Sequence, residues 1–172
     1  MRNFTRTALA AAAVCTAFTF TPSAAATPSP SASEKAAATS QQGKNCLVVL
    51  DRVKPGEKAS RVVSRTCADD KADLRINEQT VLMYWNGDSD FGGAFTAVAG
   101  WYGPCDDTGY VLELDSWWRR NISSFETRAS CDRQQAVAND GRTTRYYSGY
   151  TTAYVGDRMN DDIGWFKIWR SF

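Results

Sequence analysis

The stretch that decides the expected fold is Trp117-Trp118-Arg119-Arg120-Asn121-Ile122-Ser123-Ser124-Phe125. A second stretch has the same plan: Arg158-Met159-Asn160-Asp161-Asp162-Ile163-Gly164-Trp165-Phe166. In each, a polar turn with Asn precedes an Ile, one or two small positions and an aromatic residue, and a short strand follows. A motif used twice in one chain indicates two copies of one supersecondary unit packed face to face.

The rest of the chain consists of short β-prone runs separated by turn residues such as Pro55-Gly56 and Asn86-Gly87. The first two runs predict an N-terminal β-hairpin, and residues 68–79 predict a loop or a helical turn. Many short strands with regular turn signals are typical of an all-β sandwich. We expect strands at 46–50, 61–64, 80–85, 96–101, 110–114, 122–127, 134–137, 151–155 and 164–169.

The N-terminus has the plan of a secretory signal peptide. Arg2 and Arg6 precede a short apolar run, which ends in small residues near Ala26. Residues 27–43 are rich in Ala, Ser, Thr, Pro and Gln, which predicts a disordered linker or propeptide. Residues 44–172 have the length of a single domain. The chain is therefore expected to be secreted.

The charge balance argues against some classes of partner. Removing residues 1–26 leaves 18 basic and 19 acidic residues. A chain so close to neutrality has neither the basic footprint of a nucleic-acid-binding protein nor a polybasic membrane patch. We expect neither partner.

Four cysteines follow the signal peptide: Cys46, Cys67, Cys105 and Cys131. An even number in an exported chain indicates two disulfides, for which three connectivities are possible. We favour Cys46–Cys67 and Cys105–Cys131, because each pair closes a short local loop. A zinc site is the alternative, but the chain has no C-x-x-C pair and no histidine.

Residues 44–172 resemble a bacterial secreted βγ-crystallin-like domain of actinobacterial type. Streptomyces metalloproteinase inhibitors and some killer toxins share this fold. The resemblance covers about 81–169 and implies two Greek-key units that form a sandwich. It rests on the aromatic-Gly corners Phe91-Gly92-Gly93 and Tyr147-Ser148-Gly149 and on the two Asn/Asp turns. In the family such turns often bind calcium, so the resemblance implies one composite site from Asn160, Asp161 and Ser123. The alternative is that Asn and Asp merely suit these turns.

Catalytic chemistry has little support in the sequence. Without histidine, Ser-His-Asp and Cys-His machinery are excluded. A hydrolase would have to use carboxylates such as Glu113, Asp115 and Glu126, with one kept protonated. Alternating acids of this kind are more typical of a solvated strand face. We therefore expect no enzymatic activity and no cofactor other than the possible calcium.

The adjacent pairs Trp117-Trp118 and Tyr146-Tyr147 are the candidate contact residues. Neighbours on a strand point to opposite faces, so one ring of each pair should reach the surface unless other segments cover it. Such rings, beside arginines, would suit a protein or glycan partner. The flanking arginines are Arg119, Arg120, Arg142 and Arg145.

The sequence thus predicts a secreted, non-enzymatic, disulfide-stapled module that works by binding. An extracellular proteinase inhibitor is the second hypothesis. It would present a rigid loop, for which 102–108 and 132–144 are the candidates. A secreted antimicrobial toxin is the third.

Overall fold

The computed structural model of the protein describes residues 45–171. The expected signal peptide (1–26) and linker (27–43) lie outside the described residues. Within 45–171, none of the helices has the length and hydropathy of a membrane span.

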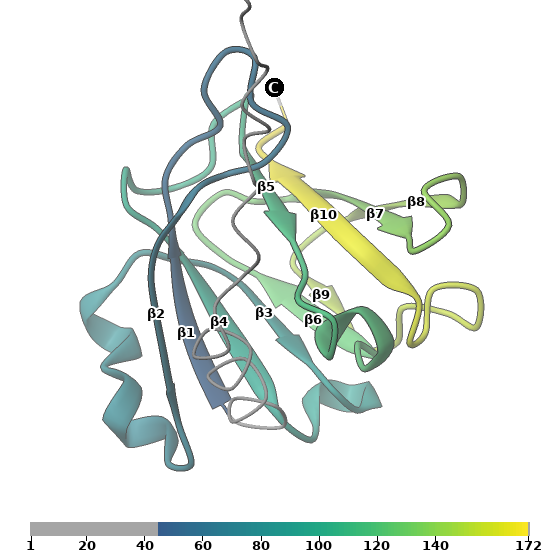
Figure 1. The fold of residues 1–172 in the computed structure, drawn as a ribbon, viewed down its shortest axis with the longest axis horizontal. Helices are drawn as coiled ribbons and strands as arrows, with labels where there is room; N and C mark the ends of the chain where they lie inside the picture. The colour runs from purple at the N-terminus through teal and green to yellow at the C-terminus, as the bar shows by residue number, and fades with distance from the viewer. Residues whose placement is uncertain (1–44, 172) are drawn as a thin grey trace, which may run out of the picture.

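Ten strands form two sheets, as expected for an all-β sandwich (Figure 1). Sheet A has the order β2-β1-β4-β3-β6-β9, and sheet B has the order β5-β10-β7-β8. The strands of sheet A are β1 (Asn45–Leu50), β2 (Val62–Ala68), β3 (Val81–Asn86), β4 (Phe95–Gly100), β6 (Ser124–Thr127) and β9 (Thr151–Thr152). Those of sheet B are β5 (Tyr110–Glu113), β7 (Arg133–Ala138), β8 (Thr144–Ser148) and β10 (Ile163–Trp169).

Each half of the chain gives one strand to the sheet of the other half. β3, β4 and β6 lie in sheet A, whereas β5 crosses to sheet B. β7, β8 and β10 lie in sheet B, whereas β9 crosses to the edge of sheet A and pairs with β6. The two repeated stretches lead into β6 and β10, and they touch, because the Asp161 N–H donates to the Ile122 carbonyl (3.2 Å). The halves are therefore interleaved.

The main core lies between the sheets and is rich in aromatic rings. Tyr110, Leu112 and Leu114 point into it, as their alternation predicted. Phe125 of β6 contacts Phe166 of β10 with ring centroids 5.4 Å apart, so equivalent residues of the two motifs meet at the centre. Such aromatic pairs contribute about 0.5–1.5 kcal/mol beyond the area that they bury.

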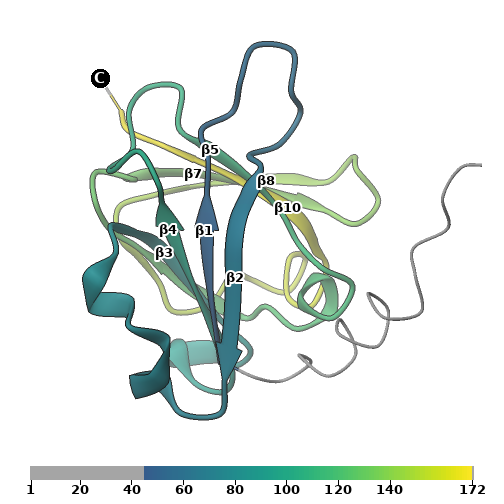
Figure 2. The same ribbon diagram turned by 60° about the vertical axis from the view of Figure 1, so that its left-hand side comes forward.

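The N-terminal hairpin is present and extends sheet A (Figure 2). Cys46 and Cys67 lie opposite each other on β1 and β2, and their disulfide confirms the favoured pairing. The second predicted disulfide, Cys105–Cys131, is also confirmed. Two disulfides indicate an oxidising, extracellular environment.

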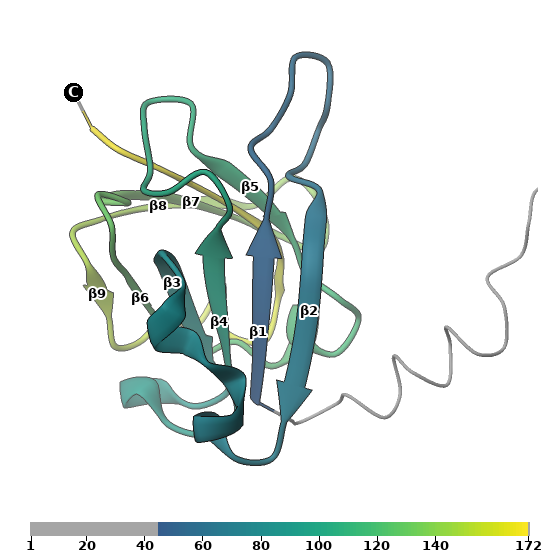
Figure 3. The ribbon, with the colours of Figure 1, turned by 90° about the vertical axis from the view of Figure 1, so that its left-hand side faces the viewer.

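A second, smaller core lies on the outer face of sheet A. Leu47, Val49, Phe95 and Ala97 are buried there against Leu74. Leu74 belongs to a helical segment between β2 and β3 that consists of two 3₁₀ turns, η1 (Lys71–Leu74) and η2 (Ile76–Glu78). Figure 3 shows this segment in front of β3 and β4. It occupies the stretch for which a loop or a helical turn was expected.

Two elements differ from their expected extents. Residues 151–155 form a strand only at Thr151–Thr152, and β8 lies where no strand was predicted. β8 is an edge strand that pairs only with β7, and four of its five residues are exposed. A strand without a buried face has no alternation of polar and apolar residues by which its sequence could reveal it.

The two expected aromatic-Gly corners do not occupy equivalent positions in the two halves, so the prediction for the second corner was wrong. Phe91-Gly92-Gly93 lies in the loop between β3 and β4. The matching loop of the second half is 139–143, between β7 and β8, where Gly141 has φ 68°. Tyr147-Ser148-Gly149 lies one strand later, where β8 ends.

Candidate contact site

Trp118 belongs to the core, which corrects its expected place on a contact surface. It is 4% exposed, and its ring stands edge-on to Trp85 (centroids 6.1 Å apart). Trp117 is half-buried and packs edge-on against Trp118 at 4.6 Å. This pair lies at the start of the turn η4 (Trp118–Arg120), where the alternation of a strand does not apply.

Of the tyrosine pair, only Tyr146 is free. It is 68% exposed. Tyr147 packs edge-on against Phe125 (5.0 Å), and its hydroxyl donates to the Val155 carbonyl (2.8 Å). Burial raises the pKa of Tyr147 to about 12. Arg145 covers the Tyr147 ring and also donates to Val155.

Two of the predicted arginines, Arg119 and Arg120, line a different hollow from Tyr146. Arg119 and Arg120 are exposed and line a shallow hollow together with Asp161 and Asp162. The Arg119 Nε donates to the Leu114 carbonyl (2.9 Å), which anchors the turn. Tyr146 lines a different hollow, beside Trp169. Arg142 lies in the turn between β7 and β8.

The three candidate carboxylates are dispersed. Glu113 lies on sheet B and Glu126 on sheet A, where it pairs with Arg128 (3.1 Å). Asp115 follows β5. Its Oδ1 accepts the N–H groups of Trp117 and Trp118, and its Oδ2 pairs with Arg65 (2.8 Å). Asp115 thus stabilises the turn and ties it to β2.

The expected calcium residues lie in adjoining segments. Ser123 is buried, and its carbonyl accepts from the Val155 N–H (2.9 Å). Asn160 donates its amide to Asp161 Oδ2 (2.7 Å), whereas its buried Oδ1 has no hydrogen-bond partner. Burial raises the pKa of Asp161, and the charge of Asp88 raises it further. Within 45–171, no cluster of three or more His, Cys, Asp and Glu side chains could hold a metal ion.

Trp101 and Tyr102 are two adjacent exposed rings, 64% and 59% exposed. They open the segment 101–109 between β4 and β5, which we call the contact loop. Sequence reasoning assigned Trp101 to the end of a strand. The strand ends at Gly100, where a turn begins with the Gly103 N–H donating to the Gly100 carbonyl (3.2 Å). A Cβ at Gly100 would collide with the Tyr110 ring and its hydroxyl.

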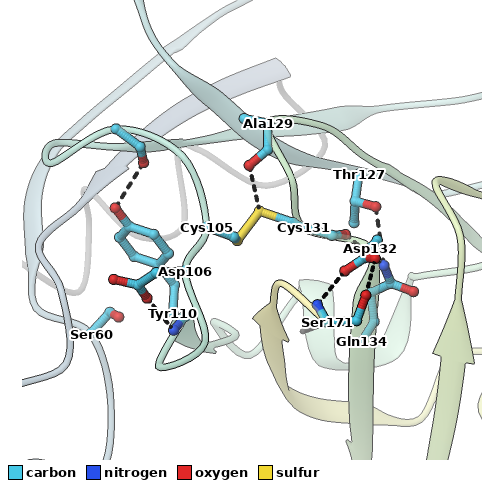
Figure 4. The surroundings of a disulfide bond; sticks show 12 residues. Ser60, Cys105, Asp106, Tyr110, Thr127, Ala129, Cys131, Asp132, Gln134 and Ser171 are labelled. Carbon is cyan, nitrogen blue, oxygen red and sulfur yellow. Dashed lines mark hydrogen bonds between the residues drawn. A yellow bond between two sulfur atoms is a disulfide. The ribbon is translucent and has the colours of Figure 1, made fainter.

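The contact loop is fixed by bonds along its whole length. The Trp101 N–H donates to the Leu50 carbonyl (2.8 Å), and the Tyr110 hydroxyl donates to the Gly103 carbonyl (2.9 Å). Figure 4 shows the disulfide that joins Cys105 to Cys131, with Tyr110 and the bond of its hydroxyl on one side. The Cys105 N–H also donates to the Ala129 carbonyl (2.9 Å).

The far end of the loop is equally constrained. Asp106 forms an ion pair with Arg52 (2.8 Å), accepts the Gly109 N–H with its Oδ1 (2.9 Å), and accepts the Arg170 N–H with its carbonyl (2.8 Å). Gly109 has φ 71° and passes so close to the Ile168 carbonyl that a Cβ could not fit. Trp101 and Tyr102 are therefore presented by a preorganised backbone.

The β1–β2 loop (51–61) stands beside the contact loop at the same end of the sandwich (Figures 2 and 3). At its base, buried Asp51 accepts from the Arg61 Nη2 (2.9 Å), and this bond lowers the pKa of Asp51. The loop holds four basic and two acidic residues, and the contact loop adds Asp106 and Asp107, so the charges around the two rings balance.

In comparisons with known proteins, no family model, no curated protein and no solved structure matches this chain. The geometry of the candidate site is therefore the basis for its assignment.

Proposed function

We propose that this protein is a secreted, non-enzymatic binding module that holds an extracellular protein through its contact loop. One observation carries the proposal: two adjacent large rings, Trp101 and Tyr102, are mostly exposed on a loop that a disulfide and several hydrogen bonds hold in place. Exposure of large aromatic rings to water is unfavourable. A fold that keeps two such rings exposed on a rigid support is typical of a surface that a partner covers.

Such rings are effective contact residues. Trp and Tyr are enriched at the energetic centres of interfaces, where truncating one costs about 2 kcal/mol or more. Because the loop is already ordered, little conformational entropy is lost when it binds.

Absence of catalysis is part of the proposal. The chain has no histidine. Asp115 and Glu126 are already used in ion pairs with Arg65 and Arg128, and Glu113 stands exposed at the end of β5. Glu126 and Glu113 line separate pockets.

The crystallin-type architecture is proposed from the strand order. In a Greek key the fourth strand lies beside the first, in the order 4-1-2-3. The orders β6-β3-β4 and β10-β7-β8 match 4-1-2 in both halves, with the third strand exchanged to the other sheet. The second half departs from the family motif at Gly164, which takes the place of a hydroxyl residue and lies against the Ala138 carbonyl.

Proteinase inhibition is the second candidate, and the contact loop favours it. An inhibitor needs one rigid exposed loop, and the predicted segment 102–108 lies within such a loop. The other predicted segment, 132–144, consists largely of β7 and a tight turn. Titration against a panel of secreted metallo- and serine proteinases tests this candidate, and absence of inhibition near stoichiometric ratios would exclude those proteinases as targets.

Capture from the culture fluid of the organism that makes the protein tests the proposal itself. Immobilised wild-type protein should retain at least one protein that the double variant Trp101→Ser/Tyr102→Ser does not retain. Tyr146→Ser is the matched control, because Tyr146 is as exposed but lies on β8. If wild type and double variant retain the same proteins, the contact loop is not the binding site.

We also propose that calcium binds where the two motifs meet. The buried Oδ1 of Asn160 has no hydrogen-bond partner, and the exposed carboxylate of Asp161 follows it in the chain, so a cation would find two oxygen ligands here. Ser123, in the adjoining segment, would add oxygen ligands, as calcium prefers.

Thermal melting tests the calcium proposal. Millimolar calcium should raise the midpoint by a few degrees, because a ligand that binds only the folded state stabilises it. Asp161→Asn should abolish the rise without breaking the turn, since Asn tolerates the positive φ of 59° at this position. An unchanged midpoint of the wild type in calcium would leave the turns purely structural.

A further inference from the structure

A concave surface lies on the outer face of sheet A, on the other side of that sheet from the main core. It is an open groove of about 500 Å³ between the helical segment, the β3–β4 loop and the sheet. That volume is within the range of about 300–1,000 Å³ found for ligand sites. The proposed contact loop has no part in it.

Two cations line this groove without a carboxylate partner. Among residues 45–171, neither Lys71 nor Arg75 forms an ion pair. Lys71 Nζ is held 4.4 Å from the centre of the Phe95 ring. The nearest acid in sequence, Asp70, uses its carboxylate to cap η1 by accepting the Ala72 N–H (2.9 Å).

Arg75 is placed there by a strained backbone. Its φ of 48° is left-handed, which is rare for a residue other than Gly, Asn or Asp. Such strain costs on the order of 1 kcal/mol and persists where the surroundings or a function demand it. Arg75 both ends η1 and begins η2, so the same conformation that bends the segment brings its guanidinium to the groove.

The remaining walls combine rings with amides. Phe91 is 39% exposed at one side, and Tyr84 lies in the floor beside Phe95 (centroids 6.1 Å apart). Asn77 and Asn86 add amide groups. Glu126, the one acid in the lining, is neutralised by its ion pair with Arg128.

We propose that the groove binds an acidic oligosaccharide, with a sugar carboxylate on Lys71 and Arg75. Guanidinium and ammonium groups bind carboxylates through strong charge-assisted hydrogen bonds. The amides suit the hydroxyls of a sugar, and the negative face of the Phe91 ring suits its C–H groups. A peptide fits less well, because β3 and β4 are paired on both sides and leave no backbone edge for it to extend.

Isothermal titration with α-1,4-linked trigalacturonate tests this proposal. The wild type should bind it saturably, and the fully methyl-esterified trimer, which has the same shape but no charge, should bind at least about tenfold more weakly. Lys71→Gln/Arg75→Asn should lose at least about as much, and Asn keeps the left-handed backbone of position 75. Equal binding of the ester, or no binding of the acid, would overturn the proposal.

Two controls complete the experiment. Lys58→Gln/Arg158→Asn removes the same charges at exposed positions outside the groove and should bind like the wild type. If this variant weakens binding as much as the groove variant, the attraction is nonspecific and the groove is not the site. Trp101→Ser/Tyr102→Ser should bind the sugar normally, so failure of the groove and failure of the contact loop are distinguishable.

Discussion

Tyr147 connects the edge of sheet B to the core through one ring and one hydrogen bond. Its neighbour Tyr146 has neither, and stands in solvent. The neutral phenol of Tyr147 is favoured in the folded state, because burial raises its pKa from 10.0 to about 12. The stability that this adds is fully present below pH 10 and is lost as pH rises through about 12.

Tyr147→Phe should therefore lower stability by an amount that depends on pH. At neutral pH the variant should be less stable by about 1 kcal/mol, because it lacks the hydrogen bond to Val155. As pH rises from 10 toward 12, the wild type should lose this advantage. Urea unfolding over that range measures both, with Tyr146→Phe as the control that should change neither. A constant difference at all pH values would contradict the assignment.

The predicted orientation of adjacent rings was correct where the residues form a strand. Alternation along a strand correctly predicted that one tyrosine of Tyr146-Tyr147 is exposed and one packed. It failed for Trp117-Trp118, because that pair begins a 3₁₀ turn in which both rings pack inward. The sequence offered no local signal for this difference.

The contact loop and the N-terminal hairpin each contain a disulfide, and the two disulfides constrain the backbone in different ways. Cys46–Cys67 joins two strands that are already paired along their length. Cys105–Cys131 joins the contact loop to the turn after β6, where no strand pairing holds the two together. The pairs enclose similar separations in sequence, 21 and 26 residues.

Replacing either cysteine pair by serine should lower stability by about 3 kcal/mol, since the loop-closure entropies are nearly equal. Only the Cys105→Ser/Cys131→Ser variant should also weaken binding of a partner captured by the wild type, because only that bridge fixes Trp101 and Tyr102. Chemical denaturation and an affinity measurement on both variants check this. Equal losses of affinity would show that the bridges act through stability alone.

Cysteine spacing correctly predicted both bridges, and turn dipeptides correctly predicted the hairpin. The sequence predicted a loop at 102–108, but it did not place Trp101 in that loop, because Trp101 continues an apolar run and reads as the last residue of a strand. In the structure a turn begins at Gly100, whose carbonyl accepts the Gly103 N–H. The dipeptide Gly103-Pro104 was the nearest sequence signal for this turn.

At the scale of the whole molecule, the repeated motif predicted two halves that meet through aromatic rings, and Phe125 and Phe166 meet in that way. The sheet order could not be predicted. The parallel pairing of β1 with β4, and the exchange of β5 and β9, depend on contacts between residues far apart in the chain. This interleaving joins the two halves, and the proposed binding end carries the contact loop and the β1–β2 loop.

The affinity of the captured partner for single variants of the contact loop tests the central claim most directly. Surface plasmon resonance should show that Trp101→Ala and Tyr102→Ala each weaken binding by about thirtyfold or more, as expected for rings at the centre of an interface. Tyr146→Ala should change it less than about twofold, the scale of a position outside the interface. Full affinity in both loop variants, with a loss in Tyr146→Ala, would contradict the account and place the binding surface on sheet B.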